Sequence, residues 1–420
     1  MNTLEGLPDD LNILILDTLN SISKVSVVVL AYVNHNIYDK ISKYAIQHKI
    51  PRRLQCHEIA AEGLLGVLQW ARSLHYRWTS LTCAKAAEYG HLEVLKWARS
   101  NGCKWNYDTC SSAALNGHLE VLKWARENCC EWNSETCINA AMNGHLEIIQ
   151  WAVSNGGFLY NDQVWYQANK FGHLHVLIWG KSKGYYLNHD VCQVAADNGH
   201  LKILKWAREN NFDWDSSTCY SAAGSGHFDI LKWAIENGCE YNSQVCAQAA
   251  GGGHLEILKW ARQIGCHWDE STCACAAQNG HLEVLKWARS EGCDWDYSTC
   301  VWAASGGHLE VLKWAHHNGC PWDSSICYNA AANGHLEVLK WARSEGCFWD
   351  TRTCSSAAFY GHLEVLKWAR LNGCPWNKLT CRNAVDNGCL EVLKWARSNG
   401  CPWDSDLEYL AKKKWPEEFS

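Results

Sequence analysis

The stretch GHLEVLKWARS, from Gly90 to Ser100, decides the fold of this 420-residue chain. Its first ten letters return unchanged at residues 117, 280, 334 and 361. With the histidine counted as position 0, the same slot occurs at residues 64, 91, 118, 145, 173, 200, 227, 254, 281, 308, 335, 362 and 389. The interval is 27 residues, except for 28 residues between 145 and 173. A fixed period of this length indicates an array of stacked repeats.

The pattern that follows each histidine predicts a helix with one apolar face. Apolar residues occupy positions +1, +3, +4, +6 and +7, which is a helical period, and Glu at +2 and Lys at +5 can pair on the other side. Position +6 is tryptophan in every repeat, for example Trp97 and Trp287, and position +14 is tryptophan in ten. Because this slot is always large and apolar, we predict that the +6 tryptophans lie in the core.

A second, shorter helix is predicted ahead of each histidine. In DTCSSAALNG, from Asp108 to Gly117, small residues surround an Ala-Ala pair and Asn-Gly provides a stop. Asp or Ser about two residues before the cysteine is the expected N-cap. The prediction is therefore an all-α solenoid of about 13 stacked helix-turn-helix units, each too small to bury its apolar faces alone.

The string from Ala113 to Asn133, AALNGHLEVLKWARENCCEWN, resembles the ankyrin repeat. The resemblance extends over residues 51–415, but these repeats are shorter than the usual 33 residues, and the shortfall falls where ankyrin repeats carry a projecting β-turn finger. The resemblance implies a protein-binding array whose short helices line a concave face. On that face, the residues expected to contact a protein partner are Tyr220, Trp302, Tyr328, Phe359 and Arg382.

Composition excludes several classes of partner. Lys and Arg total 38 against 44 Asp and Glu, a net charge of −6, which gives no electrostatic argument for binding nucleic acid or an anionic membrane. The longest apolar run, Val25 to Val33, is too short to span a bilayer, and the N-terminus lacks the pattern of a signal peptide. We expect a cytoplasmic protein with reduced cysteines.

The 24 cysteines follow the repeat: twelve lie at position −8 and nine at position +12. No repeat contains the Cys-x2-Cys spacing of a structural zinc site, and buried thiols behave as small apolar residues. We therefore predict core packing, with no metal and no cofactor. The histidine at position 0 is likewise predicted to be a turn residue that hydrogen-bonds the neighbouring repeat rather than a metal ligand. No nucleophile-base pair or phosphate loop stands out from the repeat pattern, so the sequence predicts a protein that is not an enzyme.

The first fifty residues do not repeat, and LPDDLNILILDTL resembles the opening of an F-box. The resemblance implies a helical domain that binds a Skp-type adaptor of a cullin ubiquitin ligase, with a target protein held by the array. The residues that it assigns to adaptor binding are Leu7, Pro8, Leu11, Ile15, Leu16 and Leu19. An F-box ahead of short ankyrin-like repeats is similar to proteins of large DNA viruses of amoebae, which implies the host cytoplasm.

Two other functions stay open. Residues 1–50 can instead form a helical cap, which would leave a binding scaffold without a ligase, and the cysteines can instead sequester metal or act in redox chemistry. One repeat, within residues 154–188, carries the extra residue and additional aromatic side chains such as Trp165 and Tyr186. It can be a bend, a degenerate copy or a specialised binding site.

Overall fold

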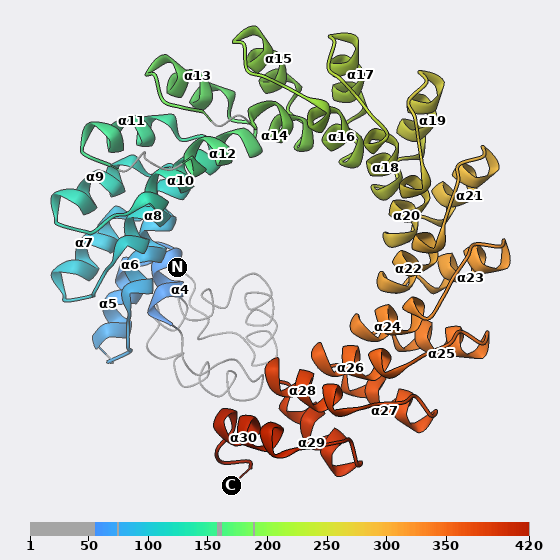
Figure 1. The fold of residues 1–420 in the computed structure, drawn as a ribbon. Helices are drawn as coiled ribbons and strands as arrows, with labels where there is room; N and C mark the ends of the chain where they lie inside the picture. The colour runs from blue at the N-terminus through green and yellow to red at the C-terminus, as the bar shows by residue number, and fades with distance from the viewer. Residues whose placement is uncertain (1–54, 74, 158–161, 188–189, 420) are drawn as a thin grey trace, which may run out of the picture. The chain divides into compact units, whose positions relative to one another are not determined.

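The computed structural model describes residues 55–73, 75–157, 162–187 and 190–419. Throughout these residues the regular secondary structure is helical, without a strand (Figure 1). The helices alternate as the sequence predicts, one before and one after each histidine slot. We call them the first and second helix of a repeat; they carry even and odd numbers respectively. The expected F-box-like domain, residues 1–50, lies outside the described residues.

The described chain forms two compact units, with the boundary between Val191 and Cys192. The helices of the first unit are α4 Cys56–Ala61, α5 Leu65–Ser73, α6 Ser80–Glu88, α7 Leu92–Ser100, α8 Tyr107–Leu115, α9 Leu119–Glu127, α10 Ser134–Met142, α11 Leu146–Ser154, α12 Gln163–Lys170 and α13 Leu174–Ser182. Helix α14, Val191–Asp197, begins at the boundary.

The second unit continues the same alternation. Its remaining helices are α15 Leu201–Glu209, α16 Ser216–Gly224, α17 Phe228–Glu236, α18 Gln244–Gly251, α19 Leu255–Gln263, α20 Glu270–Gln278, α21 Leu282–Ser290, α22 Tyr297–Ser305, α23 Leu309–His317, α24 Ser325–Ala332, α25 Leu336–Ser344, α26 Thr351–Phe359, α27 Leu363–Leu371, α28 Lys378–Asp386, α29 Leu390–Ser398 and α30 Ser405–Lys414. Within each unit the first helices pack side by side in one row and the second helices form another (Figure 1).

The sequence predicts a first helix shorter than the second, but in most repeats the two helices have the same length. Helices α8 and α9 each have nine residues, because the N-cap lies further upstream than expected. In α20 the cap is Asp269, four residues before Cys273, where the backbone is still extended and the carboxylate accepts a hydrogen bond from the Ser271 N–H. An Asp or Asn at this position satisfies a backbone donor of the first turn.

Neighbouring repeats are joined by the histidine at position 0. His335 Nε2 lies 2.9 Å from the carbonyl oxygen of Ser305, at the end of the preceding first helix. The histidine ring occupies space that a side chain on Gly307 would need, since a Cβ there would lie 2.6 Å from the ring. Gly307 also has φ +77°, which glycine adopts most readily. The predicted hydrogen bond between this histidine and the neighbouring repeat is therefore confirmed.

Gly307→Ala should destabilise the array more than Gly319→Ala. Both glycines have a positive φ, +77° and +84°, but an added Cβ meets the histidine ring only at Gly307. We expect Gly319→Ala to cost roughly 1–2 kcal/mol from the backbone conformation alone. Gly307→Ala should cost about 1–3 kcal/mol more, because the ring must move. Guanidinium unfolding of both variants measures the difference, and equal losses would contradict the proposed contact.

The tryptophans form a ladder at the side of the second helices, which corrects the prediction that position +6 is fully buried. Trp287 is half-buried and packs edge-to-face on Trp268 of the preceding repeat, with ring centroids 5.9 Å apart. The Arg289 guanidinium lies 4.2 Å from the centroid of the Trp295 ring. The fully buried core comes instead from the small and medium residues at +3, +4 and +7, such as Leu285. Tryptophan is required here for contacts between repeats, not for filling the interior.

Residues 405–419 occupy the places that the corresponding part of a further repeat would fill. The Lys414 ammonium donates hydrogen bonds to the carbonyl oxygens of Val385, at 2.7 Å, and Asp386, at 2.9 Å, at the end of α28. It therefore stands where the next histidine would stand. Phe419 is buried and stacks on Trp403, with ring centroids 6.3 Å apart, in place of the next tryptophan.

Candidate interaction surface

The five residues predicted to contact a partner all lie on first helices of the second unit. Tyr220 is on α16, Trp302 on α22, Tyr328 on α24, Phe359 on α26 and Arg382 on α28. The last four therefore lie on successive first helices, whereas Tyr220 is three repeats before Trp302. Trp302 and Phe359 are 42% and 40% exposed, large values for apolar side chains, and Tyr220 and Tyr328 are half-buried. Their role in binding stays a prediction.

Two further residues belong to this face and were not predicted. The Tyr360 ring is exposed and packs edge-to-face on Phe359, with centroids 4.8 Å apart. The Arg352 guanidinium lies 4.8 Å from the centroid of the Tyr328 ring, so it covers part of that ring. The sequence did contain a signal for both, since the other repeats have no arginine at the position of Arg352 and many have asparagine at the position of Tyr360.

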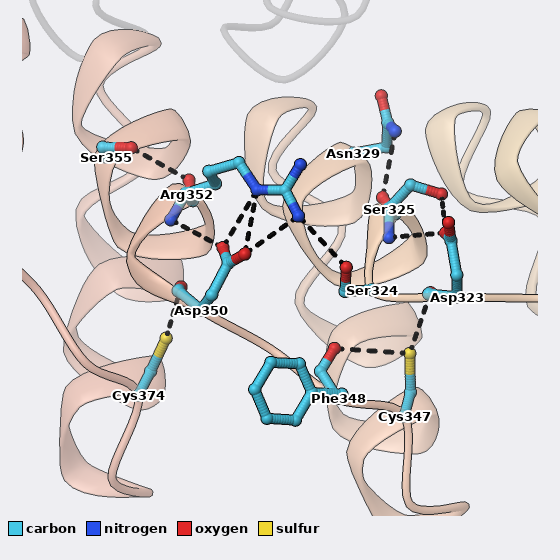
Figure 2. A network of polar contacts seen from close by, with 10 residues as sticks. All are labelled: Asp323, Ser324, Ser325, Asn329, Cys347, Phe348, Asp350, Arg352, Ser355 and Cys374. Atoms are coloured by element: carbon cyan, nitrogen blue, oxygen red, sulfur yellow. Dashed lines mark hydrogen bonds and ion pairs between the residues drawn. The ribbon is translucent and has the colours of Figure 1, made fainter.

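Arg352 is held in a network that joins α24 to α26 (Figure 2). Its Nε and backbone N–H both donate to the Asp350 carboxylate, each at 2.9 Å, and Nη2 donates to Ser324 Oγ at 3.1 Å. The Arg352 guanidinium lowers the pKa of Asp350, and the carboxylate raises the pKa of Arg352. The network fixes a cation on the surface but leaves it paired, so it does not form an anion site.

The cysteines pair in space within a repeat. In nine repeats the thiol at −8 lies beside the thiol at +12, as with Cys327 and Cys347, which are twenty residues apart in the sequence. The hydrogen bond between the sulfurs raises the pKa of Cys327, with burial adding to the rise, and lowers that of Cys347. Cys347 Sγ also donates to the Asp323 carbonyl oxygen, at 3.3 Å, in the preceding loop (Figure 2).

All cysteines are free thiols, and most are buried. Among the described residues, no group of three or more Cys, His, Asp or Glu side chains has the arrangement of a metal site. In the nine repeats that have both cysteines the two thiols are buried, and the thiol at +12 also ties adjacent loops together through the carbonyl contact.

The irregular repeat supports core packing by an independent route. At its −8 position, Trp165 replaces cysteine and is only 3% exposed, and Tyr185 replaces the cysteine at +12. Their ring centroids are 5.4 Å apart. Gly180 replaces the alanine at +7, where a Cβ would lie 2.5 Å from the Trp165 ring. Three substitutions therefore exchange a small sulfur pair for an aromatic pair in the same space.

We expect Gly180→Ala to depend on Trp165. In the natural chain the added methyl group overpacks the core, which should cost about 1–3 kcal/mol. Trp165→Cys alone should cost roughly 3–5 kcal/mol, because it leaves a cavity. In the Trp165→Cys background, Gly180→Ala should stabilise the protein by about 0.5–1 kcal/mol, since the clash is gone and alanine favours the helix. Unfolding free energies of the four proteins test this, and additive effects would refute it.

The buried thiol of Cys137 should make the folded protein less stable at alkaline pH. It lacks a sulfur partner at +12, where Gly157 stands, and burial raises its pKa to about 11. Below pH 9 the thiol is protonated in both the folded and the unfolded chain. Above pH 9 only the unfolded chain ionises, so the contribution of Cys137 should fall by about 1.4 kcal/mol between neutral pH and pH 10.

Unfolding free energies of the natural chain and of Cys137→Ala, measured between pH 7.5 and 10.5, test this. The difference should shrink as pH rises. Thr136→Val is the control, because the hydroxyl of Thr136 is equally buried but does not titrate. A constant difference for Cys137→Ala would show that the thiol ionises as it does in the unfolded chain.

The residues predicted to bind an adaptor, Leu7, Pro8, Leu11, Ile15, Leu16 and Leu19, lie outside the described residues. In the part of the chain that is described, no helix is long and apolar enough to cross a membrane.

Comparison with known proteins identifies the repeat. The family model described as "Ankyrin repeats (many copies)" matches residues 110–153, 192–235 and 300–343. The ankyrin repeat domain of human ASB11, a crystal structure, is similar over 37% of this chain and 84% of its own length, with 16% identity and a TM-score of 0.31. No curated protein matches the sequence. These three segments therefore match ankyrin repeats, a family whose arrays serve as interaction scaffolds for protein partners.

Proposed function

We propose that this ankyrin-repeat protein is a non-catalytic substrate receptor. The exposed side chains of the first helices bind a target protein, and residues 1–50 bind a Skp-type adaptor, which connects the target to a cullin ubiquitin ligase. In that complex the target protein accepts ubiquitin, and the repeat array only binds the target and orients it.

The observation that carries the target-binding half is the contrast between buried and exposed positions of the first helices. The Ala-Ala pair is buried and almost unchanged along the array, for example Ala330 and Ala331. The exposed positions next to it differ in each repeat: Trp302 on α22, Phe359 on α26 and Arg382 on α28. Because the fold does not dictate these residues, they are free to match a partner, and exposed aromatic and arginine side chains are common anchors of protein interfaces.

The adaptor-binding half rests on the sequence of the N-terminal segment. Pro8 suits the first turn of a helix, and the leucine and isoleucine residues after it follow a helical period. The second candidate is a binding scaffold in which the same apolar face seals α4 and α5. The two candidates differ in whether that face is available to another protein.

Replacing Leu7 and Pro8 with alanine should separate these candidates. For a receptor, the natural chain co-purifies with a recombinant Skp-type adaptor and the double variant does not, because a few central apolar residues supply most of the affinity of such interfaces. The thermal midpoint of the array should stay within a few degrees, since the changes lie outside the repeats. Co-expression, affinity purification and circular dichroism provide the measurements.

The matched control is Leu371→Ala, at an exposed leucine of the second unit, which should leave adaptor binding unchanged. For a scaffold, the natural chain binds no adaptor, and the double variant loses hydrogen-exchange protection in α4 and α5. That result would remove the ligase from the proposal and leave only the binding array.

A further inference from the structure

The loops of the second unit form a continuous edge. Each cysteine at +12 donates a hydrogen bond to a carbonyl oxygen of the loop before it: Cys293 to Asp269 at 3.4 Å and Cys320 to Asp296 at 3.3 Å. The same contact repeats at Cys347 and Cys374. Successive loops therefore lie side by side, one per repeat. We call the five loops between α17 and α26 the loop edge; they are residues 237–243, 264–269, 291–296, 318–324 and 345–350.

Exposed aromatic rings stand along and next to this edge without a ring partner. Tyr241 lies in the first loop, Tyr297 begins the helix after the third, and Phe348 lies in the fifth. The Phe348 side chain is 70% exposed, and its ring takes part in none of the contacts drawn in Figure 2. At the equivalent position most other loops carry polar residues or proline, such as Lys104 and Pro321, so the fold does not require a ring there.

The charge of the edge is mainly negative, although three arginines of the second helices, such as Arg289, lie over the tryptophan rings of the loops. The five loops contain no lysine or arginine, and they carry eight carboxylates, those of Glu240, Asp269, Glu291, Asp294, Asp296, Asp323, Glu345 and Asp350. Among the described residues, Asp350 is the only one of these whose carboxylate forms an ion pair with a basic side chain, that of Arg352. The corresponding loops of the first unit carry charges of both signs: Arg77 and Lys104 are basic, and Glu131 is acidic. The negative potential is therefore local to the second unit.

Carboxylates alternating with exposed aromatic rings favour a cationic partner. A lysine or arginine side chain can form an ion pair with a carboxylate and a cation–π contact with an aromatic ring. Nucleic acid is repelled by this edge. A divalent ion is disfavoured, since among the described residues no three or more Asp, Glu, His or Cys side chains are arranged to hold a metal ion.

We infer that the loop edge of the second unit binds an extended, lysine- or arginine-rich segment of the partner protein. This inference rests on the proposed function and names the class of target segment. Packed helices lie about 8–10 Å apart, and an extended chain rises about 3.3 Å per residue. A basic residue at every third position of the segment therefore meets one loop after another.

The test uses the full chain and two fluorescent peptides of identical composition. One is (Lys-Ser-Ser)5, with a lysine at every third position, and the other places its five lysines in one block ahead of ten serines. Fluorescence anisotropy at low salt gives the affinity of each. The periodic peptide should bind about fivefold more tightly than the block peptide, with an affinity that falls as salt rises.

The variant Glu240→Gln, Asp294→Asn, Asp323→Asn removes three carboxylates and keeps their size and hydrogen-bonding oxygens. It should weaken binding of the periodic peptide about tenfold. The control Asp108→Asn, Glu131→Gln, Glu135→Gln makes the same change in net charge on exposed residues of the first unit, and should alter the affinity less than twofold. Tyr297→Ala with Phe348→Ala should also weaken binding, while the slope of affinity against salt persists.

Equal binding of the two peptides, or equal losses in the two triple variants, would overturn the inference. These outcomes are separate from the proposed function. If the natural chain binds the Skp-type adaptor but the affinity of the periodic peptide does not depend on the loop edge, the proposed receptor function is kept and the inference fails. If peptide binding depends on the three carboxylates but no adaptor is recovered, the inference stands for a scaffold protein.

Discussion

The array depends on one contact, a histidine ring laid over a glycine of the preceding repeat. The contact supplies a hydrogen bond to a carbonyl oxygen that the end of a helix leaves without a partner, and the glycine supplies both the turn and the room for the ring. It survives the one change of period: His173 Nε2 lies 2.9 Å from the Met142 carbonyl oxygen, although one more residue separates them than elsewhere. The extra residue therefore lies between α11 and α12 without altering how the repeats join.

The repeat pattern predicted much of the fold, because each helix obeys local rules. The period, the helix on either side of the histidine, the surface pairs such as Glu283 and Lys286, and the hydrogen bond of the histidine are all confirmed. What failed depended on knowing which groups meet in the folded array. Trp287 looked like a core residue because tryptophan never varies at its position, yet it is half-buried at the side of the stack, where it packs on Trp268. The spacing of the cysteines did not show that the thiols at −8 and +12 of one repeat meet.

The candidate surface was predicted less completely for the same reason. Positions beside the Ala-Ala pair could be identified from the resemblance, so Trp302 and Phe359 were predicted; both are exposed, and their role in binding stays a prediction. Arg352 was missed because its importance comes from Asp350, Ser324 and the ring of Tyr328, which only the structure brings together. The loop edge was missed because no single loop is unusual. Its charge and its rings become a surface only when the sulfur contacts show that the loops are neighbours.

The end of the array has a consequence for how such a chain can change in length. Lys414 and Phe419 contact features that most repeats share, among them the carbonyl oxygens at the end of a first helix and the tryptophan at +14 that ten repeats have. The closing segment therefore makes contacts that most of the repeats could offer. Duplication or loss of a 27-residue block inside the gene would leave the closing segment fitting as before, while the order of exposed side chains is redrawn. The framework is therefore the same from repeat to repeat, whereas the length of the surface and the identity of its exposed residues can change one repeat at a time.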